Sequence, residues 1–470
     1  PGMLTDLDGA PRVHGDAPDL GAYEWRPAPG KATDGLTLSE QDTPPSLIGQ
    51  PRPGPEGIVF VKAMATGRGS SWEEATGDLQ AAIDAQSALG GGQVWIAAGR
   101  FVPNSFPKSG QTSSSEDARF TMRAGVELYG GFPPDAESVR EDCDDLADRR
   151  PREHLTVLSG DLLGDDHDPD GDGIVDDLSD IRGQNALTII DCPSSRATSA
   201  APMILDGFVV TAAYGSEQES GSALLIHAGE PVVLRNMVFS GNRHDRRGGA
   251  LRCLQARVLL EHCLFQGNGM ARGKSCEGGA VWLGQSLVQM TNCEFVGNRA
   301  ASGSAVYMDD STELELVNCT ITGNHADEWA GGAIAQARQV KENSPLRLLQ
   351  NCLFAANQGG DLAATLNPDG IAHCFFQASE PYSRFPATNL YGDPRLVRLP
   401  DCGSDGWGDD PLTPGADEGA DDDTGDTHLR ADSPCINAGD PDAVPIDTET
   451  DLDGKRRVLG RNVDIGAHEF

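Results

Sequence analysis

Apolar positions in the middle of the chain form a repeat. Its units open on Leu or Met, carry Met or Cys three positions later and Phe or Ile two further on, and close on Asn: LRNMVFSGN (234–242), LEHCLFQGN (260–268), MTNCEFVGN (290–298), LVNCTITGN (316–324) and LQNCLFAAN (349–357). Apolar and polar residues alternate within each unit, as in a β-strand with one buried face. The closing Asn residues are 26, 30, 26 and 33 positions apart, so a fixed core alternates with a variable loop.

The alternation breaks once per unit, and a second signal recurs in the other half of each unit. The break falls on Asn236, His262, Asn292, Asn318 and Asn351. Asn tolerates left-handed backbone angles and can bond to the same residue one repeat away, so we expect a corner there. The second signal is GGAL (248–251), GGAV (278–281), GSAV (303–306), GGAI (331–334) and GGDL (359–362). Small residues allow a tight bend before the next strand, so each unit is predicted to be one coil of an all-β parallel β-helix.

The combination of FxGN with GGA[ILV] resembles the polymorphic outer-membrane protein repeat, whose signatures are GGAI and FxxN. FSGN, FQGN, FVGN and FAAN match, whereas ITGN, GSAV and GGDL depart from the pattern. The resemblance covers residues 203–377. It implies a right-handed parallel β-helix of the pectin-lyase-like superfamily and a secreted or cell-surface protein with a structural or adhesive role.

The remaining chain is organised around this repeat. In order we assign 1–25 as the closing segment of a preceding unit or a donor strand, 26–56 as a Pro/Gly-rich linker, 57–132 as the N-terminal cap and first coils, 133–202 as an acidic insertion that interrupts the coils, 203–400 as the β-helix repeats, and 401–470 as C-terminal loops and a closing segment. Residues 70–89 have helical apolar spacing, Ser70 or Ser71 as N-cap and a Gly run after Leu89. They predict a short helix that covers the open N-terminal end of the solenoid.

Two segments near the ends are copies of each other. TDLDGAPRVHGDAPDLGAYEW (5–25) and TDLDGKRRVLGRNVDIGAHEF (450–470) align without a gap. We expect the second copy to close the β-helix that precedes it. The first copy then belongs to a preceding unit of a longer polypeptide, or enters a neighbouring copy of the protein as an added strand. Such a head-to-tail contact gives filaments. The alternative, in which 1–25 folds back on its own chain, stays open.

An acidic stretch, DHDPDGDGIVDDLSD (166–180), has the spacing of a calcium loop. Its carboxylates are Asp166, Asp168, Asp170, Asp172, Asp176, Asp177 and Asp180. Counted from the first, acids occupy positions 1, 3, 5 and 12 with Gly at 6, as in EF-hand-type loops; counted from the second, the stretch resembles thrombospondin type 3 repeats. Because carboxylates this close repel one another, we predict that they bind Ca²⁺. The alternative is an acidic loop without a bound ion.

Charge and cysteine content restrict the partners. Lys and Arg total 36 against 72 for Asp and Glu, a net charge of −36 that disfavours nucleic acid and anionic membranes and favours cations. No apolar run is long enough to span a membrane.

Of the 11 cysteines, five fall in the inward column and are interpreted as buried spacers. Cys402 and Cys435 lie outside it and are better candidates for a disulfide.

An enzyme of polysaccharides is the remaining alternative, because β-helices host lyases and glycosidases. These need paired carboxylates, or calcium and a base, on the outside of adjacent coils. The outward column offers Glu294, Thr320 and Leu353 without a facing pair of acids, so no catalytic residue is assigned. His262 and His373 stand at corner positions and are read as structural. A structural module is favoured over a carbohydrate-binding adhesin, and both over an enzyme.

Overall fold

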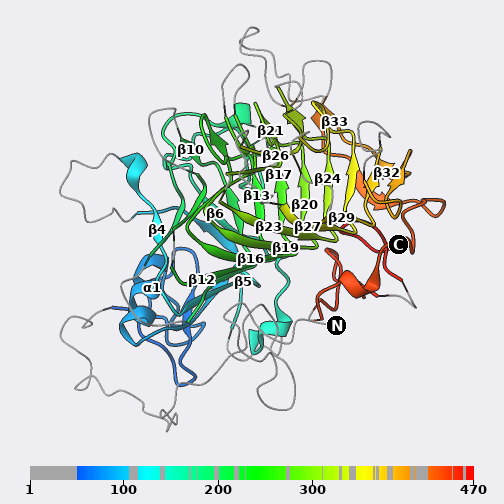
Figure 1. Cartoon of the computed structure of the whole chain (residues 1–470). Coiled ribbons are helices and arrows are strands. Elements are labelled where there is room, and N and C mark those ends of the chain that lie inside the picture. The colour runs from blue at the N-terminus through cyan, green and yellow to red at the C-terminus, as the bar shows by residue number, and fades with distance from the viewer. Residues whose placement is uncertain are drawn as a thin grey trace.

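The computed structural model describes residues 50–104, 115–137, 143–168, 171–176, 178–194, 201–215, 222–227, 229–270, 276–309, 311–327, 331–337, 346–363, 366, 370–377, 385–402, 407, 422–446, 448–458 and 462–470. Three sheets of parallel strands wind around one apolar column, and Figure 1 shows the coils stacked from the helix at one end towards the C-terminal segments at the other. The predicted all-β right-handed parallel β-helix is confirmed. The expectations for residues 1–25 and for the linker up to residue 49 lie outside the described residues.

The first two sheets have ten strands each. The first consists of β1 (Val59–Val61), β2 (Gly92–Ala97), β5 (Val126–Phe132), β8 (Met203–Asp206), β12 (Pro231–Arg235), β16 (Arg257–Glu261), β19 (Leu287–Thr291), β23 (Glu313–Val317), β27 (Leu346–Gln350) and β29 (Ile371–Ala372). The second consists of β3 (Gly99–Phe101), β6 (Thr156–Ser159), β9 (Val209–Thr211), β13 (Val238–Ser240), β17 (Leu264–Gln266), β20 (Glu294–Val296), β24 (Thr320–Thr322), β28 (Leu353–Ala355), β30 (Phe375–Phe376) and β31 (Leu390–Tyr391).

The third sheet has seven strands, and four short pairs lie beside the coils. The third sheet consists of β4 (Phe120–Thr121), β7 (Ile190–Pro193), β11 (Leu224–His227), β15 (Leu251–Leu254), β18 (Val281–Gly284), β22 (Val306–Met308) and β26 (Ile334–Gln336). The short pairs are β10 (Tyr214–Gly215) with β14 (Arg243–His244), β21 (Arg299–Ala300) with β25 (His325–Ala326), β32 (Leu396–Arg398) with β35 (Asp426–Leu429), and β33 (Asp401–Cys402) with β34 (Asp422–Asp423). The last two pairs are antiparallel and stand outside the coils.

The predicted columns stack as the repeat indicates. Phe239, Phe265 and Phe295 are fully buried, with neighbouring ring centroids 4.8 Å apart. The closing Asn residues form a buried ladder in which each side-chain amide donates to the next Asn Oδ1, at 2.9–3.1 Å, along Asn242, Asn268, Asn298, Asn324 and Asn357. A ladder of this kind satisfies polar groups inside the column and fixes the coil spacing.

The corners and bends also follow the predicted positions. The corner residues have positive φ: Asn236, His262, Asn292, Asn318, Asn351 and His373, at 50–56°. Gly248, Gly278, Gly303 and Gly332 of the GGA-type motifs have φ of 60–76°, just before β15, β18, β22 and β26. The five inward cysteines are buried free thiols, as predicted. Cys402 and Cys435 are also free, so the expected disulfide is wrong; Cys402 Sγ instead lies 2.9 Å from Gln358 Nε2.

The N-terminal helix is shorter than predicted. It is α1 (Leu79–Ala88), and its N-cap is Asp78, whose carboxylate accepts from Ala81 N, rather than Ser70 or Ser71. Residues 70–77 instead follow an irregular path, with Trp72 buried in an aromatic cluster with Trp95 and Phe132. The 3₁₀ turns are Ser115–Asp117, Leu146–Asp148, Leu178–Asp180 and Pro441–Ala443.

Two segments differ from the assigned boundaries. Residues 133–202 were expected to interrupt the coils, yet they supply β6 to the second sheet and β7 to the third. Their sequences, TVLS and IDCP, lack the GGA and FxxN signatures of the repeat. At the other end, β31 is the last wall strand, and β32 turns away to pair with β35.

Candidate functional site

The outer face of the second sheet is covered along most of its length. Its outward column, paired in register, is Val238, Leu264, Glu294, Thr320, Leu353 and Phe375. Three segments that are remote in sequence lie over this face: residues 174–176, Trp407, and the closing segment 450–470. We call these three the outer cover.

Residues 174–176 of the acidic stretch cover the N-terminal part. Ile174 packs with Val157 and Val209. Val175 N donates to Thr211 Oγ1 at 2.9 Å, and Ser240 Oγ donates to Val175 O at 3.0 Å. A Cβ at Gly241 would lie 2.2 Å from Val175 O, so glycine in the FxGN motif permits this close approach.

Trp407 covers the next coils over two further glycines of the repeat, in FVGN and ITGN. A Cβ at Gly297 or Gly323 would lie 3.3 Å from the indole ring. The indole Nε1 donates to Gly323 O, and Arg299 Nη1 donates to Trp407 O at 3.1 Å. The repeat glycine therefore has two structural roles, since it adopts positive φ and also receives the outer cover.

The closing segment covers the C-terminal part of the same face. Ala467 N donates to Thr320 Oγ1 at 2.8 Å, and Ile465 packs in a buried cluster with Leu353 and Phe375. At the corner column, Asn292 Nδ2 donates to Thr450 O at 2.7 Å. The segment lies across several coils as an irregular strap, and its described residues form no strand. The segment was expected to close the solenoid. In the structure it packs against the side wall, on the outer face of the second sheet.

A buried arginine organises the closing segment. Arg457 is 0% exposed, and its Nη2 donates to Asp464 O at 3.0 Å and Gly466 O at 2.6 Å. Its Nε lies 3.3 Å from Glu469 Oε1. Asp451, also fully buried, accepts from Lys455 N at 2.8 Å and Glu469 N at 2.7 Å. Burial raises the pKa of Glu469 to about 7, although Arg457 opposes this shift.

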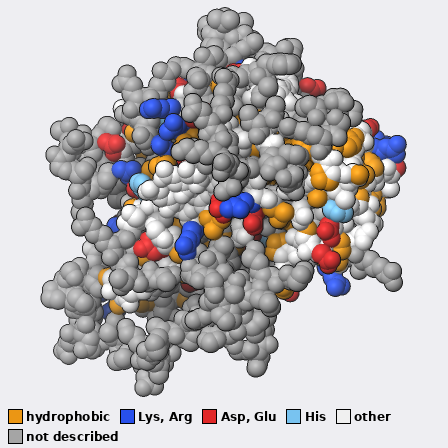
Figure 2. All heavy atoms as spheres, viewed as in Figure 1, with side chains coloured by type: hydrophobic (Ala, Val, Ile, Leu, Met, Phe, Trp, Pro, Cys, Tyr) orange, Lys and Arg blue, Asp and Glu red, His pale blue; other side chains and the backbone are white. Residues whose placement is uncertain are grey.

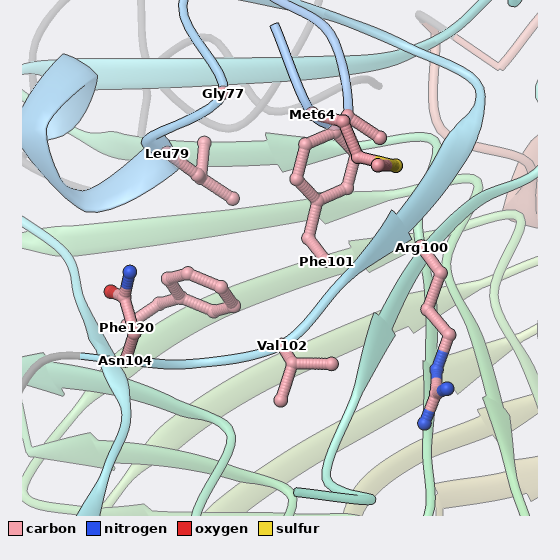
Figure 3. Close-up of a pocket in the computed structure, with 9 residues that line it drawn as sticks. Met64, Gly77, Leu79, Arg100, Phe101, Val102, Asn104 and Phe120 are labelled. Atoms are coloured by element: carbon pink, nitrogen blue, oxygen red, sulfur yellow. The ribbon is translucent and has the colours of Figure 1, made fainter. Parts of the chain in front are cut away.

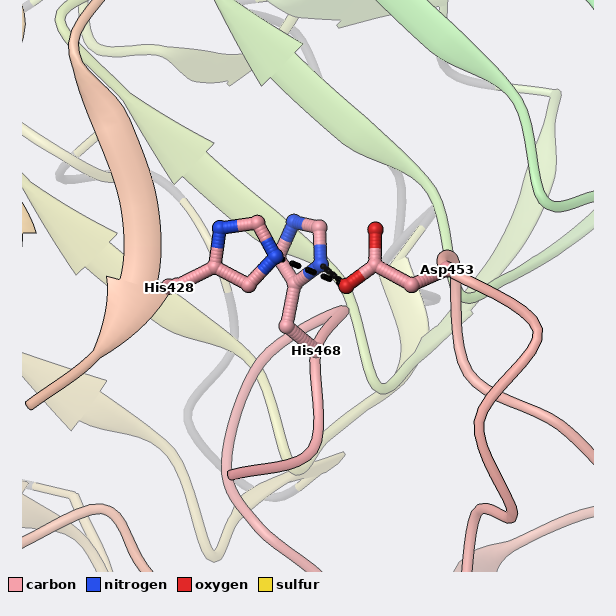
Figure 4. Close-up of side chains that lie close together, drawn as sticks. All are labelled: His428, Asp453 and His468. Atoms are coloured by element: carbon pink, nitrogen blue, oxygen red, sulfur yellow. Dashed lines mark hydrogen bonds and ion pairs between the residues drawn. The ribbon is translucent and has the colours of Figure 1, made fainter. Parts of the chain in front are cut away.

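Where the closing segment meets the wall, acidic and imidazole groups form a continuous chain. His468 Nε2 lies 3.2 Å from Glu294 Oε2, and His468 Nδ1 lies 3.1 Å from Asp453 Oδ2. The same Asp453 oxygen is 2.7 Å from His428 Nε2, and His428 Nδ1 is 2.6 Å from Asp426 Oδ1. Figure 4 shows both rings directed at the Asp453 carboxylate. We call these five residues the His–carboxylate cluster.

The electrostatics of the cluster follow from burial and charge. Burial acts to lower the pKa of His468, but its hydrogen bonds to Asp453 and Glu294 outweigh this and raise it to about 9. The bond to His468 is the main cause that holds the pKa of Asp453 well below its usual range. Burial opposes ionisation of Glu294, yet the bond to His468 keeps its pKa lowered. The sequence reasoning missed this cluster, because His428 lies outside the closing segment that carries Asp453 and His468, and no local spacing links the three residues.

The predicted calcium residues have separate partners in the structure. Asp168 accepts from Gly171 N at 2.8 Å and Gly173 N at 2.9 Å, and Asp172 accepts from Ile174 N at 2.8 Å. Asp180 lies 2.8 Å from His167, and Asp176 accepts from Ser240 Oγ at 3.4 Å. Asp170 and Asp177 lie outside the described residues. The motif 166–180 therefore stays a prediction for Ca²⁺ binding.

A different acidic group forms at the start of the stretch. Carboxylate oxygens of Asp161, Asp165 and Asp166 lie within 4.8 Å of one another. Asp161 accepts from Arg100 Nη2 at 2.8 Å, and Asp166 accepts from Asn185 Nδ2 at 2.6 Å. Burial, together with the charges of Asp161 and Asp165, raises the pKa of Asp166 to about 6. Of the predicted set only Asp166 belongs to this group; the other two precede the motif and were missed.

One small cavity and one exposed face can be compared with what a sugar polymer requires. A cavity near the N-terminal cap, between Leu79, Arg100, Phe101 and Phe120, measures about 110 Å³ (Figure 3). Ligand pockets are typically about 300–1,000 Å³. Among the side chains coloured on the face in Figure 2, basic and acidic groups are interspersed. No helix among the described residues has the length and apolarity to cross a membrane.

Comparisons with known proteins agree on the fold. Residues 181–344 match the family described as "Right handed beta helix region". No curated protein sequence matches the chain. Similar solved structures are pectate lyase Pel9A (10% identity, 88% of this chain and 96% of that one, TM-score 0.33), the pectin methylesterase from Aspergillus niger (14%, 73% and 86%, 0.23), and the mannuronan C-5 epimerase A-module from Azotobacter vinelandii (15%, 60% and 92%, 0.19).

At these identities and TM-scores the three structures carry no argument about function. The family match is to right-handed β-helices in general, and the likeness to the polymorphic outer-membrane repeat remains a resemblance of motifs. The parallel sheets of the structure and the match over residues 181–344 point to the same architecture. The chain is a right-handed parallel β-helix protein.

Proposed function

We propose that the protein is a structural module of a secreted or cell-surface assembly. In this proposal units join head to tail. Residues 1–25 bind the side wall of a neighbouring β-helix, in the same way that residues 450–470 bind the side wall of their own β-helix. The observation that carries the proposal is the buried Arg457 network of the closing segment, whose members all recur in the N-terminal copy.

The recurrence is selective. The charged residues of the network, Asp451, Arg457, Asp464 and Glu469, have identical counterparts Asp6, Arg12, Asp19 and Glu24. The residues through which the closing segment packs on the wall are identical or similar in the N-terminal copy. Ile465, Gly466 and Ala467 correspond to Leu20, Gly21 and Ala22. A fully buried Arg without carboxylate partners is strongly destabilising, so retention of the whole set supports a folded, docked state for both copies.

The position of the closing segment indicates where the first copy can dock. The wall around Thr320 and Leu353 is already covered by 450–470 of the same chain. Residues 5–25 therefore need a second wall, either of another unit in the same polypeptide or of a second copy whose own closing segment is displaced. In both cases we propose a contact of the kind that 450–470 makes, an irregular strap on a side wall, in place of an added strand.

Coverage of the outer face supports this proposal over the two alternatives. A lyase or glycosidase with a groove along the second sheet, or an adhesin that binds a glycan there, needs that face open to substrate. In the described residues the outer cover lies on it from Val209 to Phe375. Incubation with a panel of polysaccharides tests both alternatives, since lyase activity gives ultraviolet-absorbing unsaturated ends and adhesion gives binding without cleavage.

We further propose that Ca²⁺ stabilises the unit. The cluster Asp161, Asp165 and Asp166 supports this, because oxygen ligands at short mutual distance suit a hard cation. Neutralising the charge of this partly buried group would remove the mutual repulsion of its carboxylates.

The assembly proposal is tested on the full chain by sedimentation over a range of concentrations and by electron microscopy. We expect wild-type protein to self-associate. Arg12→Met should reduce association, because it removes the centre of the N-terminal network, and Arg26→Met, just beyond the duplicated segment, is the matched control. Association that survives deletion of residues 1–25 would remove this mode of docking. A strictly monomeric wild type would rule out assembly of separate chains.

A further inference from the structure

We propose that His428, Asp453 and His468 form a binding site for a divalent transition metal of the zinc class. The site joins three segments: β35, the turn 451–455 and the end of the closing segment. It does not rest on the assembly proposal, since all three residues belong to one chain with its own closing segment docked.

The donor atoms already converge. Both inner imidazole nitrogens, His428 Nε2 and His468 Nδ1, lie at 2.7 and 3.1 Å from the same oxygen of Asp453, and all three atoms are within 4.8 Å of one another (Figure 4). Ligand atoms around a tetrahedral Zn²⁺ at about 2.0–2.1 Å stand about 3.3 Å apart. Small side-chain rotations therefore suffice to place an ion between the three donors.

The outer nitrogen of each ring is held by a carboxylate. His428 Nδ1 is 2.6 Å from Asp426 Oδ1, and His468 Nε2 is 3.2 Å from Glu294 Oε2. Glu294 is fixed in turn by Thr427 Oγ1, which donates to its Oε1 at 2.7 Å. A carboxylate on the outer nitrogen keeps a proton there and fixes the ring, which is the usual support of metal-bound histidine. The pattern occurs twice here, once for each ring. A bound Zn²⁺ then displaces the proton that the inner nitrogen donates to Asp453.

Access and charge fit the same ion. The side chains of His428 and Asp453 are 42% and 28% exposed, so an ion and a water ligand can reach the site from solvent. Lys455 Nζ lies 3.6 Å from Asp453 Oδ2 and donates to Glu469 O at 3.4 Å, but its side chain is half exposed and can turn outwards when an ion binds. Two imidazoles and one carboxylate suit zinc-class ions better than Ca²⁺, which prefers oxygen ligands alone.

The test uses the full chain without a histidine tag, stripped with chelator and kept reduced. We expect calorimetry to show one Zn²⁺ bound, and Co²⁺ to give visible bands of a tetrahedral site without thiolate-to-cobalt charge transfer. His428→Ala and Asp453→Asn should each weaken binding at least tenfold. Asp426→Asn, which alters only the outer partner, should weaken it by about 10–100-fold. Zinc should raise the melting temperature of the wild type and not that of His428→Ala.

The matched control is His227→Ala. His227 forms a single pair with Asp191 at 3.0 Å and has similar exposure to His428, so its loss should leave zinc binding unchanged. His428 and Asp426 are partly exposed, so circular dichroism should show both variants folded. The proposal would be overturned if the wild type bound no zinc at micromolar concentration. It would also be overturned if His428→Ala and Asp453→Asn bound zinc as tightly as the wild type, or if the cobalt spectrum showed thiolate ligands.

Discussion

His468 Nε2 lies 3.2 Å from Glu294 Oε2, although the two residues are 174 positions apart. The contact is buried, since Glu294 is 7% and His468 6% exposed. It fastens the end of the closing segment to the outer face of β20. An outward-facing strand position is thus part of the protein interior.

This contact changes the expected effect of Glu294→Lys. An outward strand position taken alone predicts a nearly silent change. In the structure the new ammonium would face His468 inside the outer cover, and loss of one partner of a buried pair costs about 3–5 kcal/mol. We now expect a large fall in the free energy of unfolding measured with denaturant. Glu315→Lys on the first sheet, which is half-buried and bonded to Gln289, should cost far less.

Phe295→Asp tests the inward column. Phe295 is fully buried and stacked 4.8 Å from Phe265, so the change places a charge in a close-packed core. Truncation of a buried Phe alone costs about 3–5 kcal/mol, and the carboxylate adds desolvation. We expect little soluble folded protein, whereas Phe295→Leu should fold with reduced stability. Normal yield and circular dichroism for Phe295→Asp would contradict the position of this column.

The asparagine ladder gives a third prediction. Asn298 Oδ1 accepts from Asn268 N and Nδ2, and Asn298 Nδ2 donates to Asn324 Oδ1 at 2.9 Å. Asn298→Ala leaves several buried polar groups unpaired, each costing about 1–3 kcal/mol. We expect a clear loss of denaturant stability, together with faster hydrogen exchange in the adjoining coils. Gln285→Ala, at an exposed positive-φ position, is the control and should change stability little.

These cases show what the repeat could and could not reveal. Local periodicity fixes which face of each strand is inward, so the positions of Phe295, Asn298 and the corner Asn292 were predictable. The partners of outward residues depend on how distant segments return to the wall, and nothing in the period encodes that. Hence the meeting of Glu294 with His468, and of Gly297 with Trp407, was not predictable from the repeat. The N-cap at Asp78 was missed for a smaller reason, because Ser71 offered an equally suitable local signal.

The last prediction concerns Ca²⁺, for which sequence and structure indicate different ligands. If Ca²⁺ binds only the folded chain, it should raise the free energy of unfolding by about 2.7 kcal/mol at roughly 100 times its Kd. If the group found in the structure holds the ion, Asp165→Asn should abolish this increment. The double variant Asp168→Ala, Asp170→Ala should abolish it only if the motif 166–180 binds as the sequence predicts. Exposed Asp442→Asn is the control. Titration with Ca²⁺ after EGTA treatment separates this site from the His–carboxylate cluster. If calorimetry shows no heat of binding at millimolar Ca²⁺, the calcium proposal is wrong and the acidic stretch only covers the wall.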